Sequence, residues 1–213
     1  MDDRKDKPFI VGVIGHAKSG KDTYVDAVLR SNLLEACHAE NYGSIALAAG
    51  LKRMAEILGF TKDDCYDQAR KEVVNPIFGI TPRKAMQDIG TIFREKFGKD
   101  IWLKSFELRV VNSFTPDSLI FVPDIRFPNE ASYFRERFHC VMVKIIRPSL
   151  DLSLPMYQHE SETLVDTIPI EENDITITND GSLEEFKLKC VQNFVPIING
   201  YRKHEVSADP FIN

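Results

Sequence analysis

The chain has 213 residues, of which 43% are hydrophobic and 28% charged, and its formal net charge is −5. This composition indicates a folded protein and excludes the low hydrophobicity of disordered chains. The negative charge is opposite to what broad nucleic-acid binding requires, so we expect no nucleic-acid partner. No apolar run approaches the roughly 20 residues of a membrane span, and residues 1–8 lack the apolar core of a secretory signal, so we expect no membrane partner and a cytoplasmic location.

The four cysteines stand far apart and form no CxxC pair: Cys37, Cys65, Cys140 and Cys190. Such spacing fits neither a zinc site nor a dense disulfide framework. We therefore expect free, mostly buried thiols.

Short β-rich runs alternate with segments of helical spacing. The expected strands are residues 9–14, 43–47, 119–122, 141–146 and 175–178, and the expected helices are residues 21–34, 51–58, 82–97 and 183–194. This alternation predicts an α/β protein with a parallel sheet covered by helices. No repeat or linker divides the chain, so we expect a single domain over residues 1–213. Residues 147–174 are polar, contain three prolines and show no period, which predicts a loop or lid.

The first expected strand leads directly into a glycine-rich turn and a helix. Gly15 and Gly20 would let backbone N–H groups turn toward phosphate oxygens, and Lys21 could reach the β and γ phosphates. The positive end of the helix dipole would add to this attraction. The pattern predicts a P-loop, with a solvated glycine-rich turn as the weaker alternative.

A P-loop usually has Ser or Thr directly after its lysine, whereas this chain has Asp22 followed by Thr23. Thr23 could contact a phosphate while Asp22 holds Mg²⁺, directly or through water. A steeply raised Mg²⁺ requirement in Asp22→Ala would support this assignment.

The helix expected over residues 82–97 begins with Thr81 as its N-cap and has Arg83 and Lys84 in its first turn. Cations are disfavoured at a helix N-terminus, so the pattern suggests a compensating anion such as an acceptor phosphate. Gln87 could read a base edge, and Gly90 would leave room for a ring. We place Arg83, Gln87, Gly90, Thr91 and Arg94 on one helix face, and Ala85, Met86, Ile89, Ile92 and Phe93 on the other. An ordinary solvated polar face stays the alternative.

The strand expected over residues 119–122 ends near Asp124 and Arg126. In open α/β sheets, ligands gather at the carboxyl ends of the strands, so both residues would face the same crevice as the P-loop. Asp124 could orient the Mg²⁺ shell, and Arg126 could bridge the donor and acceptor phosphates. Turn formation by Asp124 and by Pro128-Asn129 is the alternative.

Five segments together resemble the deoxynucleoside monophosphate kinases of tailed bacteriophages: GHAKSGKDT, RKAMQDIGT, VPDIRFPNE, KIIRP, and HESE followed by DITITNDGSLEEF. The resemblance covers residues 11–188. It implies a three-layer P-loop kinase fold with a five-stranded parallel sheet in the order 2-3-1-4-5. It also implies an acceptor-binding helical insert at about residues 35–117, ATP and Mg²⁺ as cosubstrates, deoxynucleoside monophosphate acceptors and a homodimer. If the source is a phage, the location is the host cytoplasm.

The resemblance also implies roles for individual residues. The residues that bind ATP would be Gly15, Ala17, Lys18, Ser19, Gly20, Lys21, Asp22, Thr23 and Arg147. The residues that bind the acceptor would be Arg83, Lys84, Gln87, Gly90, Thr91, Trp102, Asp124, Arg126 and Glu130. Lys21, Asp22, Asp124 and Arg126 would be catalytic, and Asp22 and Thr23 would hold the metal. Without the resemblance, the single tryptophan would be expected in the core.

Two other functions are compatible with a P-loop. One is a kinase of another phosphorylated metabolite, such as dephospho-coenzyme A or phosphomevalonate. The other is a nucleotide-dependent switch, because residues 61–64, TKDD, match the guanine-recognition pattern of GTPases. The match precedes the strand that ends near Asp124 instead of following it, so a chance match is the better explanation. The cluster His159–Glu162 is a weak metal motif, and a hydrogen-bond cluster that orders the lid is favoured.

Overall fold

The computed structural model describes residues 4–36 and 41–208, and Cys37 lies outside these residues. The chain divides into two compact units: the first lies in Met1–Ala46 and Val110–Asn213, and the second is Leu47–Arg109. The second unit lies inside the insert predicted over residues 35–117.

The first unit contains a five-stranded sheet whose order is β2-β3-β1-β4-β5. Its strands are β1 (Phe9–Ile14), β2 (Tyr42–Ser44), β3 (Leu119–Ile125), β4 (Cys140–Ile146) and β5 (Ile175–Thr178). All four pairings are parallel. The predicted fold class and strand order are therefore confirmed.

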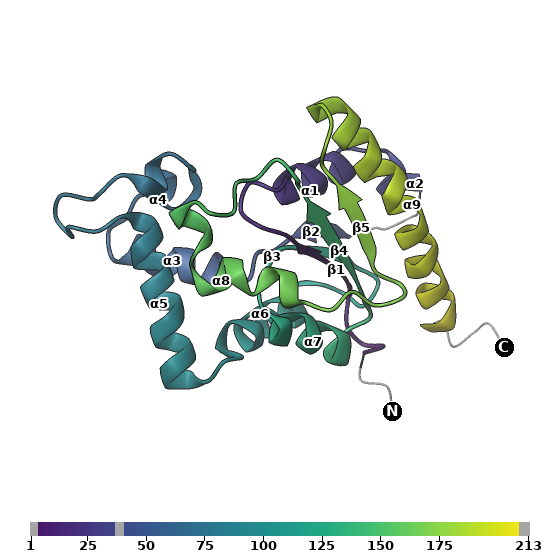
Figure 1. Cartoon of the computed structure of the whole chain (residues 1–213). Helices are drawn as coiled ribbons and strands as arrows, with labels where there is room; N and C mark the ends of the chain where they lie inside the picture. Colours follow the sequence, from purple (N-terminus) through teal and green to yellow (C-terminus); the bar gives the residue numbers. More distant parts are fainter. Residues whose placement is uncertain (1–3, 37–40, 209–213) are drawn as a thin grey trace. The chain divides into compact units, whose positions relative to one another are not determined.

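Helices cover both faces of this sheet (Figure 1). Helices α1 (Lys21–Leu29), α2 (Leu33–Ala36) and α9 (Leu183–Ala208) lie on one face, and α7 (Pro128–Arg137) lies on the other. Alternate residues of β1 point to opposite faces, so Val11 and Val13 pack into the cluster that contains Tyr24 of α1 and Phe194 of α9. Burial on both faces explains why β1 is an unbroken apolar run. The sheet thus carries the carboxyl ends of β1 and β3, where the sequence predicts the site.

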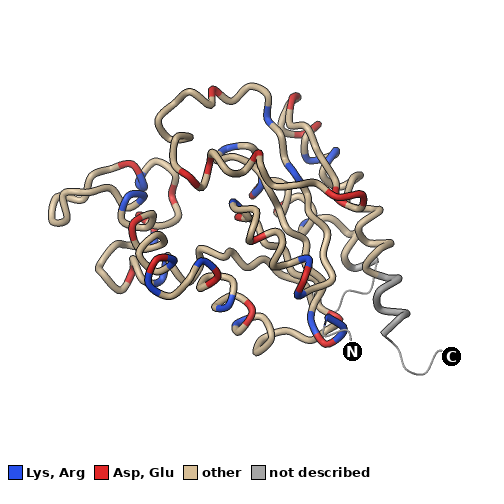
Figure 2. The backbone as a smooth tube through the Cα atoms, turned by 60° about the horizontal axis from the view of Figure 1, so that its bottom comes forward, with Lys and Arg blue, Asp and Glu red and all other residues tan. Residues whose placement is uncertain are grey.

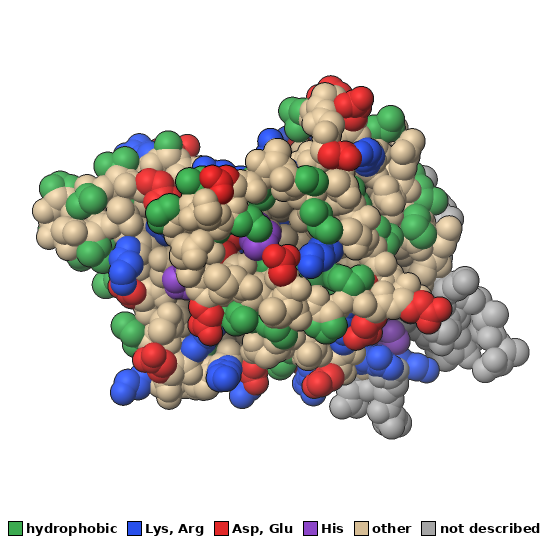
Figure 3. Space-filling view, viewed as in Figure 1, with side chains coloured by type: hydrophobic (Ala, Val, Ile, Leu, Met, Phe, Trp, Pro, Cys, Tyr) green, Lys and Arg blue, Asp and Glu red, His purple; other side chains and the backbone are tan. Residues whose placement is uncertain are grey.

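The second unit is helical. It contains α3 (Ala49–Ile57), α4 (Lys62–Tyr66), the 3₁₀ turn η1 (Arg70–Glu72), α5 (Pro82–Phe97) and the first part of α6 (Ile101–Ser113). Its small core joins Ala55, Phe60, Cys65, Ala85 and Met86. Hydrophobic side chains also gather at the surface over α4 and the segment that follows it, where Val73, Val74, Ile77 and Phe78 are exposed (Figure 3).

The segment predicted as a lid contains three short helical turns. They are η2 (Pro155–Tyr157), α8 (Glu160–Thr163) and η3 (Val165–Thr167). His159 is the N-cap of α8, and its Nδ1 atom accepts a hydrogen bond from the backbone N–H of Ser161 at 3.1 Å. The cluster His159–Glu162 therefore forms an ordered helical turn.

Several predicted bounds differ from the structure for local reasons. The helix predicted over residues 21–34 is two helices, because the Ser31 hydroxyl donates to the Val28 carbonyl at the end of α1. The strand predicted over residues 43–47 is shorter in the structure, where β2 ends at Ser44. The turn predicted as an alternative at Pro128 is wrong: Pro128 begins α7, and the Glu130 side chain caps that helix. Helices α4 and α6 were not predicted, and α9 continues past residue 194 through Pro196.

Three further features concern the whole described chain. Basic and acidic residues are interspersed along the backbone (Figure 2). Among the helices of residues 4–36 and 41–208, none has the length and hydropathy that crossing a membrane requires. Of the described cysteines, Cys65 and Cys190 are buried, Cys140 is partly buried, and all three are free thiols.

Candidate active site

The turn after β1 adopts the backbone that its glycines allow. A Cβ atom on Gly15 would lie 2.6 Å from the Ser19 Oγ atom and 2.7 Å from the Ile145 carbonyl oxygen. Gly20 has a φ of +112°, and a Cβ atom there would lie 2.7 Å from the Phe186 ring. Glycine is thus required at both positions. At Gly15 a side chain would have no space, and at Gly20 both the space and the backbone φ exclude one.

The turn ends at a helix N-terminus that no side chain caps. Gly20 is the N-cap of α1 and supplies no side-chain hydrogen bond to the first N–H groups of the helix. The Ser19 hydroxyl is buried and has no hydrogen-bond partner among the described residues. Free N–H groups at the positive end of a helix dipole form an anion-binding site. These observations fit the predicted P-loop.

Lys21 begins α1 and is buried at the turn. Its Nζ atom donates a hydrogen bond to the His16 carbonyl oxygen at 2.6 Å. Burial, followed by the positive charge of Arg126, lowers the pKa of Lys21 to about 7, although Glu162, Asp22 and Asp124 act in the opposite direction. The structure thus brings together the four residues that were predicted to be catalytic, and adds Glu162 to them.

Two predicted site residues at the end of β3 have different surroundings. The Arg126 side chain donates to the Gly15 carbonyl oxygen at 3.2 Å and to the Glu162 Oε1 atom at 2.5 Å. Glu130, in contrast, is buried, and its Oε2 atom accepts hydrogen bonds from the backbone N–H groups of Arg126 and Phe127. Glu130 therefore has a structural role as the cap of α7, and its predicted contact with the acceptor stays a prediction.

The lid segment contacts the P-loop at several points. Arg147 donates to the Lys18 carbonyl oxygen at 3.2 Å, and the Tyr157 hydroxyl donates to the Ala17 carbonyl oxygen at 3.2 Å. The Ala17 backbone N–H donates to the Glu162 Oε2 atom at 2.8 Å. Both backbone polar groups of Ala17 are thus held by lid residues. Lys18 has a φ of 61°, in the left-handed region that non-glycine residues seldom adopt.

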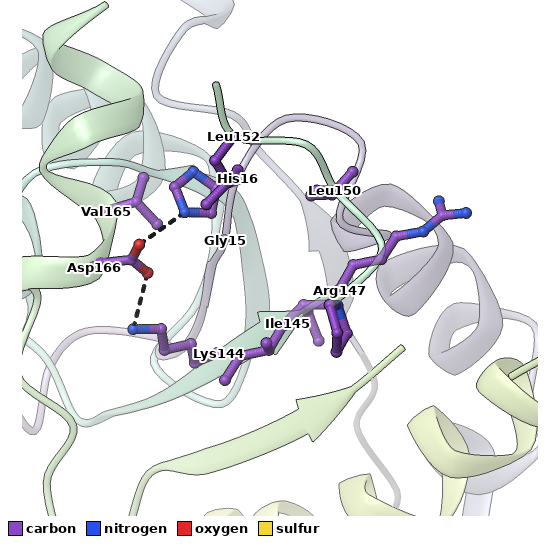
Figure 4. Close-up of a pocket in the computed structure, with 11 residues that line it drawn as sticks. Gly15, His16, Lys144, Ile145, Arg147, Leu150, Leu152, Val165 and Asp166 are labelled. Atoms are coloured by element: carbon purple, nitrogen blue, oxygen red, sulfur yellow. Dashed lines mark hydrogen bonds and ion pairs between the residues drawn. The ribbon is translucent and has the colours of Figure 1, made fainter. Parts of the chain in front are cut away.

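A pocket of about 180 Å³ lies beside the first residues of the P-loop (Figure 4). Its walls include His16, the last three residues of β4 with Arg147 after them, and Val165 and Asp166 of the lid. Asp166 lies 3.0 Å from the His16 Nε2 atom and 3.5 Å from the Lys144 Nζ atom. Partial burial raises the pKa of Asp166, but the hydrogen bond with His16 and the charge of Lys144 outweigh burial and hold this pKa below its ordinary value.

Six of the nine predicted acceptor residues lie in the second unit, whereas Asp124, Arg126 and Glu130 lie in the first. The structure gives Arg83 and Lys84 anionic partners from the second unit. The Arg83 Nε atom lies 2.5 Å from the Glu72 Oε1 atom, and Lys84 pairs with Asp88 one turn along α5. The two cations at the start of α5 suggested a compensating anion, and the Glu72 and Asp88 carboxylates of the chain itself provide negative charge there. Thr91 is exposed and Gln87 is partly buried on the same helix.

Gly90 and Trp102 have packing roles within the second unit. Gly90 is buried, and a Cβ atom there would lie 3.0 Å from the Leu51 Cδ1 atom. The Trp102 Nε1 atom donates to the Gly90 carbonyl oxygen at 3.3 Å, and its ring lies 5.4 Å from the Phe93 ring. The Leu51 side chain of α3 packs where a Gly90 side chain would lie, and the predicted room for a nucleotide ring at Gly90 stays a prediction. The predicted apolar face is only partly buried, since Ile92 is exposed.

The comparisons with known proteins decide the family. The sequence profile described as "Deoxynucleotide monophosphate kinase" matches residues 55–190, more than half of the chain. The chain belongs to the deoxynucleotide monophosphate kinase family.

Two viral relatives and one solved structure are similar to this family member. A protein of Acanthamoeba polyphaga mimivirus, named as a candidate deoxynucleotide monophosphate kinase, is 27% identical over 201 residues, which cover 86% of this chain and 96% of that protein. The deoxynucleotide monophosphate kinase of Enterobacteria phage T4 is 29% identical over 54% of this chain and 46% of its own length. A gluconokinase from Sinorhizobium meliloti 1021 aligns with a TM-score of 0.42 and 13% identity over 92% of this chain and 96% of that chain.

Sequence reasoning about this family member missed three residues that hold the P-loop. They are Glu162, Asp166 and Asn179, whose side-chain amide donates to the Ser19 carbonyl oxygen at 2.9 Å. The segments HESE and NDGS were noticed in the sequence, but neither shows which partner its residues contact. Those partners lie about 150 residues away along the chain, so no local pattern could reveal them.

Proposed function

We propose that this family member transfers the terminal phosphoryl group of ATP to a deoxynucleoside monophosphate and so forms the diphosphate and ADP. The observation that carries the proposal is the P-loop with its uncapped helix N-terminus and its buried lysine, found in a chain of the deoxynucleotide monophosphate kinase family.

The proposed reaction needs little acid–base chemistry. A phosphomonoester has a second pKa of about 6, so at neutral pH the attacking phosphate oxygen of the acceptor is already largely deprotonated. This oxygen forms a bond to the γ phosphorus while the bond between that phosphorus and the β–γ bridging oxygen breaks, and the electron pair leaves with ADP. The protein's task is to bring two anions together and to stabilise the charge of the transferring group.

The first unit supplies the groups that would bind ATP. The N–H groups of the P-loop and the ammonium group of Lys21 would bind the β and γ phosphates, and Arg126 would stabilise the charge that develops during transfer. Arg147 and the lid lie on the P-loop, where they would exclude water from the reaction. All the residues predicted to bind ATP lie in this unit.

The residues present fit a magnesium ion. Mg²⁺ keeps several waters and usually takes one or two carboxylates together with phosphate oxygens. Two carboxylates near Lys21 would hold the ion: Asp22, exposed in the first turn of α1, and Asp124, at the end of β3. Both raise the pKa of Lys21. Thr23, next to Asp22 in the chain, would hold the ion with them. When bound, the ion would neutralise phosphate charge.

The second unit supplies the groups that would bind the acceptor. We propose that Arg83 and Lys84 bind its phosphate, which would replace Glu72 and Asp88 as their anionic partners. Gln87 and Thr91 would contact the nucleoside. The packed positions of Gly90 and Trp102 support a role in holding α5 in place, and their contact with the acceptor stays a prediction.

A coupled assay of ADP release tests the proposed function. The acceptors are dTMP, dGMP, dCMP and dAMP, with their ribose counterparts, dephospho-coenzyme A and phosphomevalonate beside them. We expect brisk ADP formation with at least one deoxynucleoside monophosphate and almost none without an acceptor. Activity with only one of the two metabolites would contradict the proposal, as would slow, acceptor-independent hydrolysis of the kind that a nucleotide-dependent switch shows.

The structure explains the sequence feature that suggested a switch. Thr61 is the N-cap of α4, its Oγ1 atom accepts from the Asp64 N–H at 3.1 Å, and the Asp64 carboxylate accepts from the Thr61 N–H at 2.9 Å. Residues 61–64 therefore form a capping box, so their sequence has a structural reason.

The homodimer and the cytoplasmic location remain proposals that rest on the family resemblance. Light scattering of the purified protein would measure the mass in solution. A mass twice the 24.3 kDa of the chain is expected.

A further inference from the structure

Glu162 is a buried carboxylate whose two oxygens have different partners, both in or beside the P-loop. Its side chain is 7% exposed. The Oε1 atom accepts from Arg126 at 2.5 Å, and the Oε2 atom accepts from the backbone N–H of Ala17 at 2.8 Å. The His16 Nδ1 atom lies 3.5 Å from the same Oε2 atom. A carboxylate held at both oxygens has little freedom to turn.

Arg126 needs such a partner because another cation lies close by. Its positive charge is the second largest influence on Lys21, after burial, and it acts against the protonated ammonium group. The Arg126 side chain is 21% exposed, so water screens this repulsion only in part. Glu162 forms an ion pair with Arg126, and its negative charge offsets the cost of placing two cations side by side.

The backbone around Glu162 is suited to hold it in place. The residue lies in α8, where the His159 side chain accepts from the Ser161 N–H and the His159 carbonyl accepts from the N–H groups of Glu162 and Thr163. The Tyr157 hydroxyl donates to the Ala17 carbonyl oxygen, so the lid contacts Ala17 on both sides of that residue. Glu162 is therefore fixed from its own segment as well as from the P-loop.

We propose that Glu162 is a positioning residue for phosphoryl transfer: it holds the Arg126 guanidinium beside Lys21 in the place where Arg126 meets the transferring group. This inference rests on the proposed function, because the role of Arg126 does. Glu162 acts through Arg126 and need not touch either substrate. A displacement of about 1 Å in a charge-stabilising group can cost on the order of 100-fold in rate.

A double-mutant cycle in kcat tests the proposal with Glu162→Gln, Arg126→Gln and the double variant. Glutamine keeps an oxygen for the Ala17 N–H but removes the charge that holds Arg126. We expect Glu162→Gln to lower kcat about 100-fold, with a much smaller change in the KM for ATP. Arg126→Gln should lower kcat by roughly 100- to 1,000-fold. The double variant should be no slower than Arg126→Gln, because Glu162 has no further effect once Arg126 is gone.

Glu160→Gln is the matched control, since Glu160 is an exposed acid on the same short helix. It should leave kcat and both KM values unchanged. Thermal unfolding of each variant shows whether it folds. Multiplying effects in the double variant would overturn the proposal. So would tighter ATP binding with unchanged kcat in Glu162→Gln, because that result would mean that the carboxylate competes with phosphate.

A second readout does not need turnover. The Nε–H signal of Arg126 in a ¹⁵N NMR spectrum is the one that disappears in Arg126→Lys. We expect it to be sharp in the wild type and in Glu160→Gln, and to broaden or shift in Glu162→Gln. An unchanged signal in Glu162→Gln would overturn the inference. If the wild type transferred no phosphoryl group, the proposed function would be wrong, and the NMR signal would still decide whether Glu162 holds Arg126.

Discussion

Each unit of the molecule holds an arginine against a glutamate, and the two pairs differ in their exposure to water. In the first unit the Glu162 side chain of the pair with Arg126 is 7% exposed. In the second unit the Glu72 side chain of the pair with Arg83 is 52% exposed. An exposed pair is worth about 0–1 kcal/mol, whereas removal of one partner from a buried pair costs roughly 3–5 kcal/mol.

This difference suggests two ways to prepare a site for phosphate. The first unit holds its cations in fixed places before ATP arrives, which is how a group that stabilises a transition state is preorganised. The second unit holds Arg83 with a partner that a phosphate can replace at little cost. We therefore expect substitutions in the first unit to affect chemistry and those in the second to affect acceptor binding.

The largest effect is expected from Lys21→Ala. This substitution removes the buried ammonium group that contacts the P-loop carbonyl of His16 and that would neutralise the β and γ phosphates. We expect kcat with every acceptor to fall by on the order of 1,000-fold or more, as for other groups that stabilise developing charge. The measurement is the ADP-release assay at saturating ATP. A variant that kept a tenth of the wild-type rate would remove Lys21 from the catalytic set.

A smaller and different effect is expected from Arg83→Ala. A charge-assisted hydrogen bond contributes about 1.5–3 kcal/mol, so the KM for the acceptor should rise roughly 10- to 100-fold while the KM for ATP changes little. Arg70→Ala is the control, because Arg70 is an exposed arginine of the same unit that pairs with Asp63 and Asp64. If the acceptor KM were unaffected by Arg83→Ala, this residue would not belong to the acceptor site.

Glu72→Gln tests whether the exposed pair is replaceable. This change removes the carboxylate that competes with the acceptor phosphate for Arg83. Because an exposed pair is worth at most about 1 kcal/mol, we expect the acceptor KM to fall by up to roughly 5-fold. Steady-state kinetics at two salt concentrations would measure the effect, which should shrink at high salt. A rise in the acceptor KM would show instead that Glu72 orients Arg83.

The smallest predicted signal is a fraction of one proton, and it arises in the first unit. The pKa of Lys21 is lowered to about 7, so at pH 8 the empty protein holds this amine mostly neutral. A neighbouring polyphosphate would raise that pKa, and ATP binding should therefore take up a proton at pH 8. Below pH 7 the amine already carries its proton, so the uptake should fade toward pH 6.

Calorimetry of ATP binding in two buffers that differ in ionisation enthalpy measures this uptake. The apparent binding enthalpies should differ between the buffers at pH 8 and converge at pH 6. Equal enthalpies in both buffers at pH 8 would contradict a Lys21 that is neutral in the empty site.

The parts of the structure that the sequence predicts well are those with a local cause. The strand 9–14 is a continuous apolar run that ends at Gly15, and its bounds match β1. The helix 82–97 begins where Thr81 and Pro82 predict, because an N-cap hydroxyl and a proline at the first position are strong start signals. The P-loop follows from its glycines and lysine in the same way.

The parts that sequence reasoning missed depend on contacts distant along the chain. Nothing near Glu162 in the sequence indicates that its carboxylate meets Ala17 and Arg126. Likewise, the resemblance implies an acceptor role for Glu130, but the sequence around Pro128 suggests a turn and does not show that both residues begin a helix. The sequence also does not show that Leu51 of α3 packs beside Gly90 of α5.

The most direct measurement of the central claim follows the γ phosphate itself. ATP labelled with ³²P at the γ position is incubated with the protein and each deoxynucleoside monophosphate, and the products are separated by chromatography. The account predicts that the label appears in a deoxynucleoside diphosphate and that Lys21→Ala abolishes its appearance. Label that stayed in ATP, or that was released as inorganic phosphate whether or not an acceptor was present, would contradict the account.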